Sequence, residues 1–253
     1  MNTSTNKIHL EICIDSMESA LAAQKGGADR VELCANLAEG GTTPSAGMIK
    51  TCRTISDLEL YVMIRPRSGD FCYSPYEFEI MREDIQIAKK LGADGVVFGL
   101  LLPNGEIDLE RTKELVQCAA PMNVTFHRAF DMCKDPLKGL EDLIQAGVYR
   151  ILTSGQKQTA WEGQNLLREL GEKAGNRIKI MAGAGINPEN LEELLRTTNL
   201  SECHLSAKSR IESPMEYRNP NVYMGGIPGG SEYEIYRSDI NTIREIKSII
   251  NKI

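Results

Sequence analysis

The chain has no long hydrophobic run and no CxxC pair of cysteines. Its apolar stretches are shorter than the roughly 18 residues that a helix needs to cross a bilayer. The first residues, MNTSTNKIHLEICI, also lack the basic and apolar regions of a signal peptide. We therefore predict neither a membrane protein nor a secreted one.

Charge of one sign is not concentrated anywhere in the sequence. The formal net charge is −6, and acidic and basic residues are spread along the whole chain. Nucleic-acid binding would need a basic patch with interleaved aromatic residues, so nucleic acid is not an expected partner. The seven scattered cysteines suit a reducing compartment better than a disulfide framework. We expect a cytoplasmic protein whose cysteines act as thiols or metal ligands.

What the sequence does contain is a repeated unit, a short β-branched run followed by a stretch of helical periodicity. Its 253 residues, 42% of them hydrophobic, match the usual length of one barrel domain. Alternating strands and helices predict a parallel sheet, and eight units close most simply into a single-domain (β/α)₈ TIM barrel of the α/β class, with a doubly wound sheet as the alternative. The expected strands are 9–14, 30–34, 60–65, 95–101, 123–127, 150–154, 178–183 and 203–207.

Residues typical of helix ends support this division. Gly27, Gly92 and Gly147 each lie just before a predicted strand, where a helix is expected to end. Cap residues or a first-turn proline, as in Asp135-Pro136 and Asn187-Pro188, mark helix starts. The one long irregular stretch is 207–231, which we predict to be a loop over the C-terminal face of the barrel.

Polar side chains recur in one phase of the predicted strands. Alternate strand residues point into a barrel, and those near the carboxyl ends face the pocket in which barrel enzymes react. A buried carboxylate is costly unless it is paired, so glutamates and arginines in this phase should neutralise each other around one pocket. The inward set is Glu11 and Cys13, Glu32 and Cys34, Arg65 with Arg67 just beyond it, His127 followed by Arg128 and Asp131, and His204 and Ser206.

One hypothesis for this set is an isomerase-like or lyase-like enzyme that acts on a small anionic or phosphorylated metabolite. Glu11, Glu32 and His127 would exchange protons, and Arg65 would stabilise negative charge. Barrels commonly bind phosphate after strands seven and eight. The anion-binding candidates are Arg67, Arg128, Asp131, Gly183, Gly185 and Ser206. The alternatives are a purely structural ion-pair network and glycines that only form a tight turn.

Cys13 and Cys34 carry a second hypothesis, because they occupy matching places on neighbouring strands roughly 4.8 Å apart. A soft metal ion could bridge the two sulfurs. Two thiolates suit Cu(I) better than zinc, which normally takes three or four protein ligands. The alternative is a pair of ordinary buried cysteines.

Several long motifs resemble the CutC family, named for copper homeostasis. They run from EICIDSMESALAAQKGGADRVELCANLAEGGTTPS through MIRPRSGDFCYS, VTFHRAFDM and LTSGQ to MAGAGI, so the resemblance spans nearly the whole chain. One departure is Ser68, where the family pattern has RPRGGDF. The resemblance implies an intracellular single barrel that binds Cu(I) through Cys13 and Cys34. The expected partners are thus a copper ion or a small anionic metabolite, and a homo-oligomer is compatible with the sequence.

Overall fold

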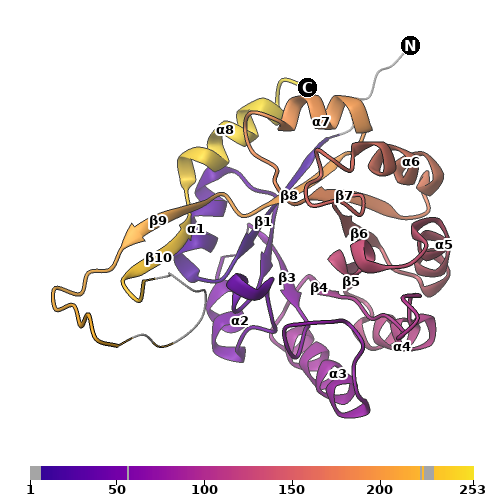
Figure 1. Ribbon diagram of the computed structural model, residues 1–253, viewed down its shortest axis with the longest axis horizontal. Helices are drawn as coiled ribbons and strands as arrows, with labels where there is room; N and C mark the ends of the chain where they lie inside the picture. The colour runs from indigo at the N-terminus through magenta and orange to yellow at the C-terminus, as the bar shows by residue number, and fades with distance from the viewer. Residues whose placement is uncertain (1–6, 56, 223, 225–230) are drawn as a thin grey trace.

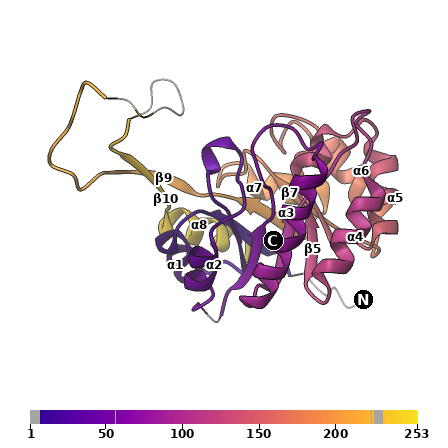
Figure 2. The ribbon, with the colours of Figure 1, turned by 90° about the horizontal axis from the view of Figure 1, so that it is seen from below.

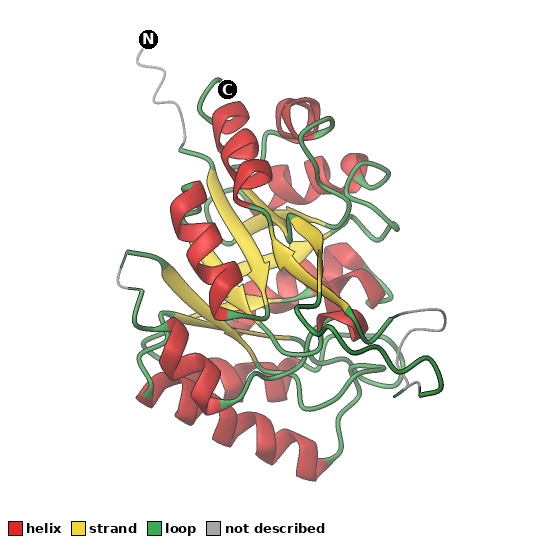
Figure 3. Cartoon of the chain, turned by 90° about the vertical axis from the view of Figure 1, so that its left-hand side faces the viewer, coloured by secondary structure: helices red, strands yellow, loops and turns green. Residues whose placement is uncertain are grey.

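The computed structural model describes residues 7–55, 57–222, 224 and 231–253. Eight parallel strands pair in chain order, and the last of them, β8, pairs with the first, β1, to close a barrel. The helices surround the strands in Figure 1 and flank them in the side view of Figure 3. The predicted (β/α)₈ barrel is therefore confirmed, and the open sheet is excluded.

The elements follow one another as the repeated unit predicts. The barrel strands are β1 (His9–Ile14), β2 (Arg30–Leu33), β3 (Glu59–Met63), β4 (Gly95–Phe98), β5 (Asn123–Phe126), β6 (Arg150–Thr153), β7 (Lys179–Gly183) and β8 (Glu202–Leu205). The α-helices are α1 (Met17–Gly26), α2 (Ala46–Cys52), α3 (Pro75–Lys90), α4 (Leu109–Ala119), α5 (Pro136–Ala146), α6 (Gln164–Ala174), α7 (Leu191–Thr198) and α8 (Ile240–Ile250). Short 3₁₀ helices η1 (Leu37–Glu39) and η2 (Arg128–Met132) follow β2 and β5.

The helix ends show how local sequence sets these boundaries. Asp135 accepts hydrogen bonds from the first turn of α5, and Gly147 ends that helix with a left-handed backbone at φ 80°. The start of α7 differs from the prediction. Asn187 accepts the N–H groups of Glu189 and Asn190, so Asn187-Pro188 forms a turn and the helix begins only at Leu191.

The main core lies between the strands and the helices. Ile12, Ile14, Val31 and Leu33 are buried there, in the opposite phase from the glutamates and cysteines of the same strands. A separate cluster inside the barrel contains Cys13, Cys34, Tyr61, Met63 and Val97. The alternation along β1 and β2 thus separates an apolar outer face from an inner face that carries chemically reactive groups.

A buried ion network fills the barrel toward the amino ends of the strands. Arg30 donates to Glu11 and, at 2.8 Å, to Glu202. Arg150 lies 2.5 Å from Glu202 and also donates to the hydroxyl of Thr125. Two carboxylates balance two guanidinium groups, which removes much of the cost of burying them. The expected neutralising network therefore exists, but its arginines are Arg30 and Arg150.

An arm projects between β8 and α8. Strand β9 (Lys208–Glu212) pairs antiparallel with β10 (Glu234–Ser238), and Figures 1 and 2 show the ribbon extending sideways from the barrel. The predicted loop 207–231 thus contains a strand near its start, and the ribbon beyond that strand extends away from the barrel in Figures 1 and 2. Residues 223 and 225–230 of the loop lie outside the described part of the chain.

Removing one buried carboxylate tests the network. Glu202→Gln leaves Arg30 and Arg150 with Glu11 as their one buried anionic partner, because Glu59, which also pairs with Arg30, is exposed. We therefore expect a loss of about 3–5 kcal/mol in the free energy of unfolding. Urea denaturation measures it. Glu141→Gln is the matched control, because the Glu141–Arg177 pair is exposed on both sides and its loss should change stability little. Equal effects of the two changes would contradict a stabilising role for the network.

Candidate functional site

A cavity of about 830 Å³ opens at the carboxyl ends of the barrel strands. Most of the predicted site residues line it, namely Cys13, Glu32, Arg65, His127, Arg128, Asp131, Gly185 and Ser206. The structure does not bring Glu11, Cys34, Arg67 or Gly183 to its wall. The phase of the strands therefore predicted one common pocket but not which side chains reach its surface.

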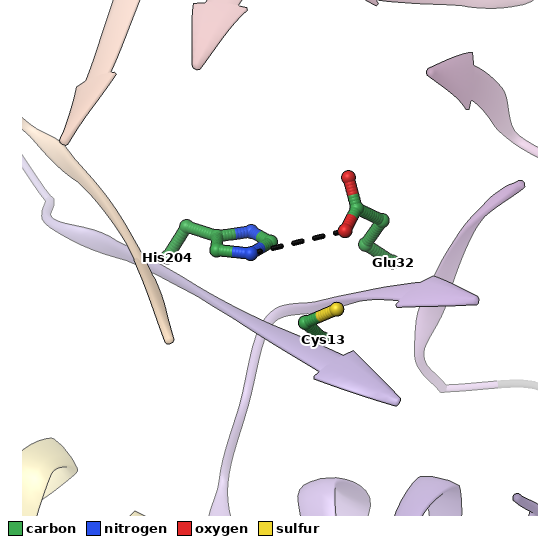
Figure 4. Close-up of side chains that lie close together, drawn as sticks. All are labelled: Cys13, Glu32 and His204. Carbon is green, nitrogen blue, oxygen red and sulfur yellow. Dashed lines mark ion pairs between the residues drawn. The ribbon is translucent and has the colours of Figure 1, made fainter. Parts of the chain in front are cut away.

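Three side chains in the cavity wall point toward one another in Figure 4, namely Cys13, Glu32 and His204. Their donor atoms all lie within 4.8 Å of one another. The imidazole Nε2 of His204 is 3.8 Å from a carboxyl oxygen of Glu32. Behind Cys13, the sulfur of Cys34 is 3.9 Å from the Cys13 sulfur and 3.5 Å from Glu32. Two sulfurs, an imidazole and a carboxyl group thus form one donor set, which is buried except for the partly exposed His204.

Strand register explains this cluster. Cys13 lies opposite Glu32 in the β1–β2 pair, and Glu11 lies opposite His204 in the β1–β8 pair. Glu11 is fully buried and 2.7 Å from Nδ1 of His204, while its other oxygen binds Arg30. Glu11 therefore orients His204 from beneath the cavity. The sequence placed His204 in the inward phase without a role, and its contact with Glu11 becomes visible only once β8 pairs with β1.

Burial and contacts shift the proton affinities of the cluster. Burial raises the pKa of Glu32 well above its ordinary range. The contact with the Cys34 thiol, supported by His204, lowers the pKa of Cys13 to about 5. Burial alone lowers the pKa of His204, but the acidic groups around it, Glu32, Cys13 and Glu11, raise it well above its ordinary value. Cys13 is therefore a thiolate at neutral pH, while the shifts of Glu32 and His204 both favour their protonated forms.

His127 differs from His204, because it holds no charge. Its Nδ1 accepts the N–H of Ala129, so the ring proton of the neutral imidazole sits on Nε2. Burial, with the nearby Arg65 guanidinium, lowers the pKa of His127 to about 3. Within the described residues Nε2 has no hydrogen-bond partner. His127 is therefore a hydrogen-bond donor at neutral pH, which differs from the proton exchange that the sequence suggested.

The two arginines after β3 hold loops together. Arg65 donates to the carbonyl oxygens of Glu39, Gly41 and Gly69, at 2.8 to 2.9 Å. Arg67 binds Glu77 and Asp70, away from the cavity. The predicted anion-binding role of Arg67 has no support in this arrangement, because β3 ends at Met63 and the strand phase does not extend to residue 67.

Gly183 and Gly185 also have different surroundings. A side-chain carbon at Gly183 would lie 2.5 Å from Leu152, so the glycine there permits close packing inside the barrel. Gly185 has φ 69° and lines the cavity. Of the two predicted cradle glycines, only Gly185 is therefore placed to contact a ligand.

Comparisons with known proteins identify the family to which the chain belongs. A family model described as the CutC family matches residues 8–209. The chain belongs to the CutC family. The family protein CutC of Bacteroides thetaiotaomicron is 51% identical over 96% of this chain and 99% of its own length. The human copper homeostasis protein cutC homolog is 45% identical over 99% of this chain and 92% of its own length.

A solved structure supports the same assignment. The putative copper homeostasis protein CutC from Streptococcus agalactiae superposes with a TM-score of 0.75 at 36% identity, over 79% of this chain and 98% of that one. In the CutC chain described here, none of the helices in the described residues has the length and apolar character to span a membrane.

The neutral state of His127 has a consequence for stability against pH. Between pH 6.5 and about 3 the unfolded chain binds a proton at His127 that the folded chain does not, so stability should fall as the pH falls through this window. Denaturant unfolding at several pH values should show a flatter acid limb for His127→Gln. His9→Gln, at the opposite end of the barrel, serves as the control. If both variants keep the wild-type slope, the imidazole is not held neutral.

Proposed function

We propose that this protein binds Cu(I) between the sulfurs of Cys13 and Cys34. The observation that carries the proposal is the 3.9 Å separation of these sulfurs inside the barrel. At that distance one ion can contact both sulfurs with only small movements of the side chains. Thiolates are soft ligands, which favour Cu(I) over harder divalent ions.

The surroundings of the pair fit a monovalent soft ion. The low pKa of Cys13, about 5, means that one ligand is already deprotonated at neutral pH. Met63 belongs to the same buried cluster and offers a thioether, another soft donor. Cys13 lines the cavity, whereas Cys34 is buried behind it. Copper would therefore enter through the cavity and meet Cys13 first.

Family membership supports the proposal at a coarser level. The human and mouse relatives both bear the name copper homeostasis protein cutC homolog. Their names link the family with copper but specify neither the ion's ligands nor its oxidation state. The short distance between the two sulfurs supports Cys13 and Cys34 as the ligands, and their softness supports Cu(I) as the ion.

Anaerobic titration with Cu(I) against a chromophoric chelator tests the site. We expect one ion per chain, and we expect Cys13→Ser with Cys34→Ser to weaken binding by more than the roughly 100-fold that outer-shell changes cost. Cys118→Ser is the control, because Cys118 lies on α4 outside the barrel interior. Unchanged affinity in the double variant would end the proposal, as would a preference of the wild type for Zn²⁺.

We further propose that the cavity gives the protein an enzymatic activity, with acid–base chemistry of the isomerase or lyase type. The observation in favour is the cavity itself, since about 830 Å³ is far more than one ion needs and falls in the range of small-molecule sites. Glu32 serves as the general acid, because burial raises its pKa and one of its oxygens is unpartnered within the described residues. His127 donates a hydrogen bond to the substrate, and Glu11 orients His204.

Deuterium exchange tests this second function. Small hydroxy and keto acids, as free acids and as phosphate esters, are incubated with the protein in D₂O, and NMR follows the C–H groups next to carbonyls. Glu32 protonates the carbonyl oxygen and thereby acidifies the neighbouring C–H, whose proton passes to the Cys13 thiolate and is replaced by deuterium from the solvent. We therefore expect exchange with the wild type and at least about 100-fold slower exchange with Glu32→Gln. The Arg67→Gln variant should catalyse this exchange at the wild-type rate. Equal rates for wild type and Glu32→Gln would remove Glu32 from the chemistry.

A further inference from the structure

One side of the cavity contains several N–H groups that have no hydrogen-bond acceptor among the described residues. They come from η2, from the turn after β7 and from the turn after β8. We call this group the donor recess and define it by Arg128, His127 and the backbone N–H groups of Gly185, Ile186 and Ala207. It is separate from the cysteine pair, because none of its members contacts Cys13 or Cys34 through a described hydrogen bond.

Arg128 is held along one edge only. Its Nε lies 2.7 Å from Asp131, and its Nη2 donates to the hydroxyl of Ser154 at 3.1 Å. Within the described residues its Nη1 has no partner. Asp131 is fixed in turn by the N–H groups of Ser154 and Gln156 and by the hydroxyl of Thr153. The guanidinium is thus preorganised, with a free N–H edge in the cavity wall.

The backbone donors lie in turns of unusual conformation. Ala184, Gly185 and Ala207 have φ values of 81°, 69° and 46°, a region that alanine rarely adopts. Their carbonyl oxygens are occupied, by the N–H of Ala160, the amide of Asn190 and the N–H of Asp239. No hydrogen bond among the described residues uses the N–H groups of Gly185, Ile186 or Ala207. Successive free N–H groups in such turns attract anions.

His127 adds a buried donor to the same cavity wall. Its side chain is only 4% exposed, and Nε2 has no partner within the described residues. A buried donor without an acceptor destabilises the protein, so a ligand oxygen that accepts from Nε2 would relieve that cost. Apolar side chains, among them Leu37, Met63 and Phe71, line another part of the cavity.

We propose that the donor recess binds the oxyanion end of a small organic acid, a phosphate monoester or a carboxylate, whose apolar body lies against Leu37, Met63 and Phe71. The proposal rests on the cavity of the second proposed function and names its ligand class, but it needs neither copper nor catalysis. A free guanidinium edge and several backbone N–H groups match the acceptors of an oxyanion. Asp131 does not repel the ligand strongly, because Arg128 and four other donors already occupy its oxygens.

Titration calorimetry with glycerol phosphate in one arm and succinate in the other tests the recess with metal-free full-length protein. We expect at least one probe to bind, and Arg128→Gln to weaken that binding about tenfold or more. Arg128→Lys should restore part of it. Arg67→Gln is the matched control, because it removes one positive charge outside the cavity, and it should leave the Kd unchanged. Amide NMR signals of Gly185 and Ala207 should move with the bound probe.

Two results would decide against the recess, and the others identify its ligand. No binding of either probe at tens of millimolar would overturn the proposal, as would equal weakening by Arg128→Gln and Arg67→Gln, which indicates unspecific charge attraction. Stronger glycerol phosphate binding identifies a phosphate ester site, and stronger succinate binding identifies a carboxylate site. Cys13→Ser with Cys34→Ser should keep the probe affinity, and Arg128→Gln should keep Cu(I) affinity. Failure of the copper or exchange experiments therefore remains distinguishable from failure of the recess.

Discussion

The site depends on the Glu11 carboxylate, which makes two contacts. One oxygen binds Arg30 in the ion network beneath the cavity, and the other binds Nδ1 of His204 in the wall above it. Burial by itself raises the pKa of Glu11, but Arg30 and His204 hold it well below its ordinary range. The carboxylate therefore stays charged and fixes the imidazole, which leaves Nε2 facing Glu32 and Cys13. Without that contact, His204 would lose the partner that orients it toward Glu32 and Cys13.

The cavity also divides its chemistry between its two sides. Cys13 and Glu32 line the β1 and β2 side, while the turns after β5, β7 and β8 carry the donors that we propose for an oxyanion. His204 and His127 illustrate the division, because acidic neighbours keep one charged while burial beside Arg65 keeps the other neutral. A barrel can hold both states because each strand end presents its side chain to different neighbours.

The repeated strand–helix unit was enough to predict the barrel, since period-2 and helical patterns alternate with little ambiguity. The phase of each strand also placed Cys13, Glu32, His127 and His204 inside. The phase does not show how far along the barrel axis each side chain lies. Arg30 shares the phase of Glu32 but lies one layer lower, where it meets Glu202 from β8.

Contacts made outside the strands were beyond the same reasoning. Arg67 lies past the end of β3, where alternation no longer sets direction, and it turned to Glu77 at the start of α3. The pairing of β9 with β10 depends on residues on both sides of a long loop, so no local sequence pattern predicts it. The paired strands and the unpaired turns thus mark where sequence periodicity is informative and where it is not.

The arm has a consequence for how such chains can vary. It leaves the barrel after β8 and returns before α8, so both ends of the excursion are anchored in the same βα unit. Because the entropy of closing a loop rises only slowly with its length, residues can be added or lost there at small cost to the barrel. The arm is therefore the part of this architecture that is freest to diverge, while the register of β8 against β1 stays fixed.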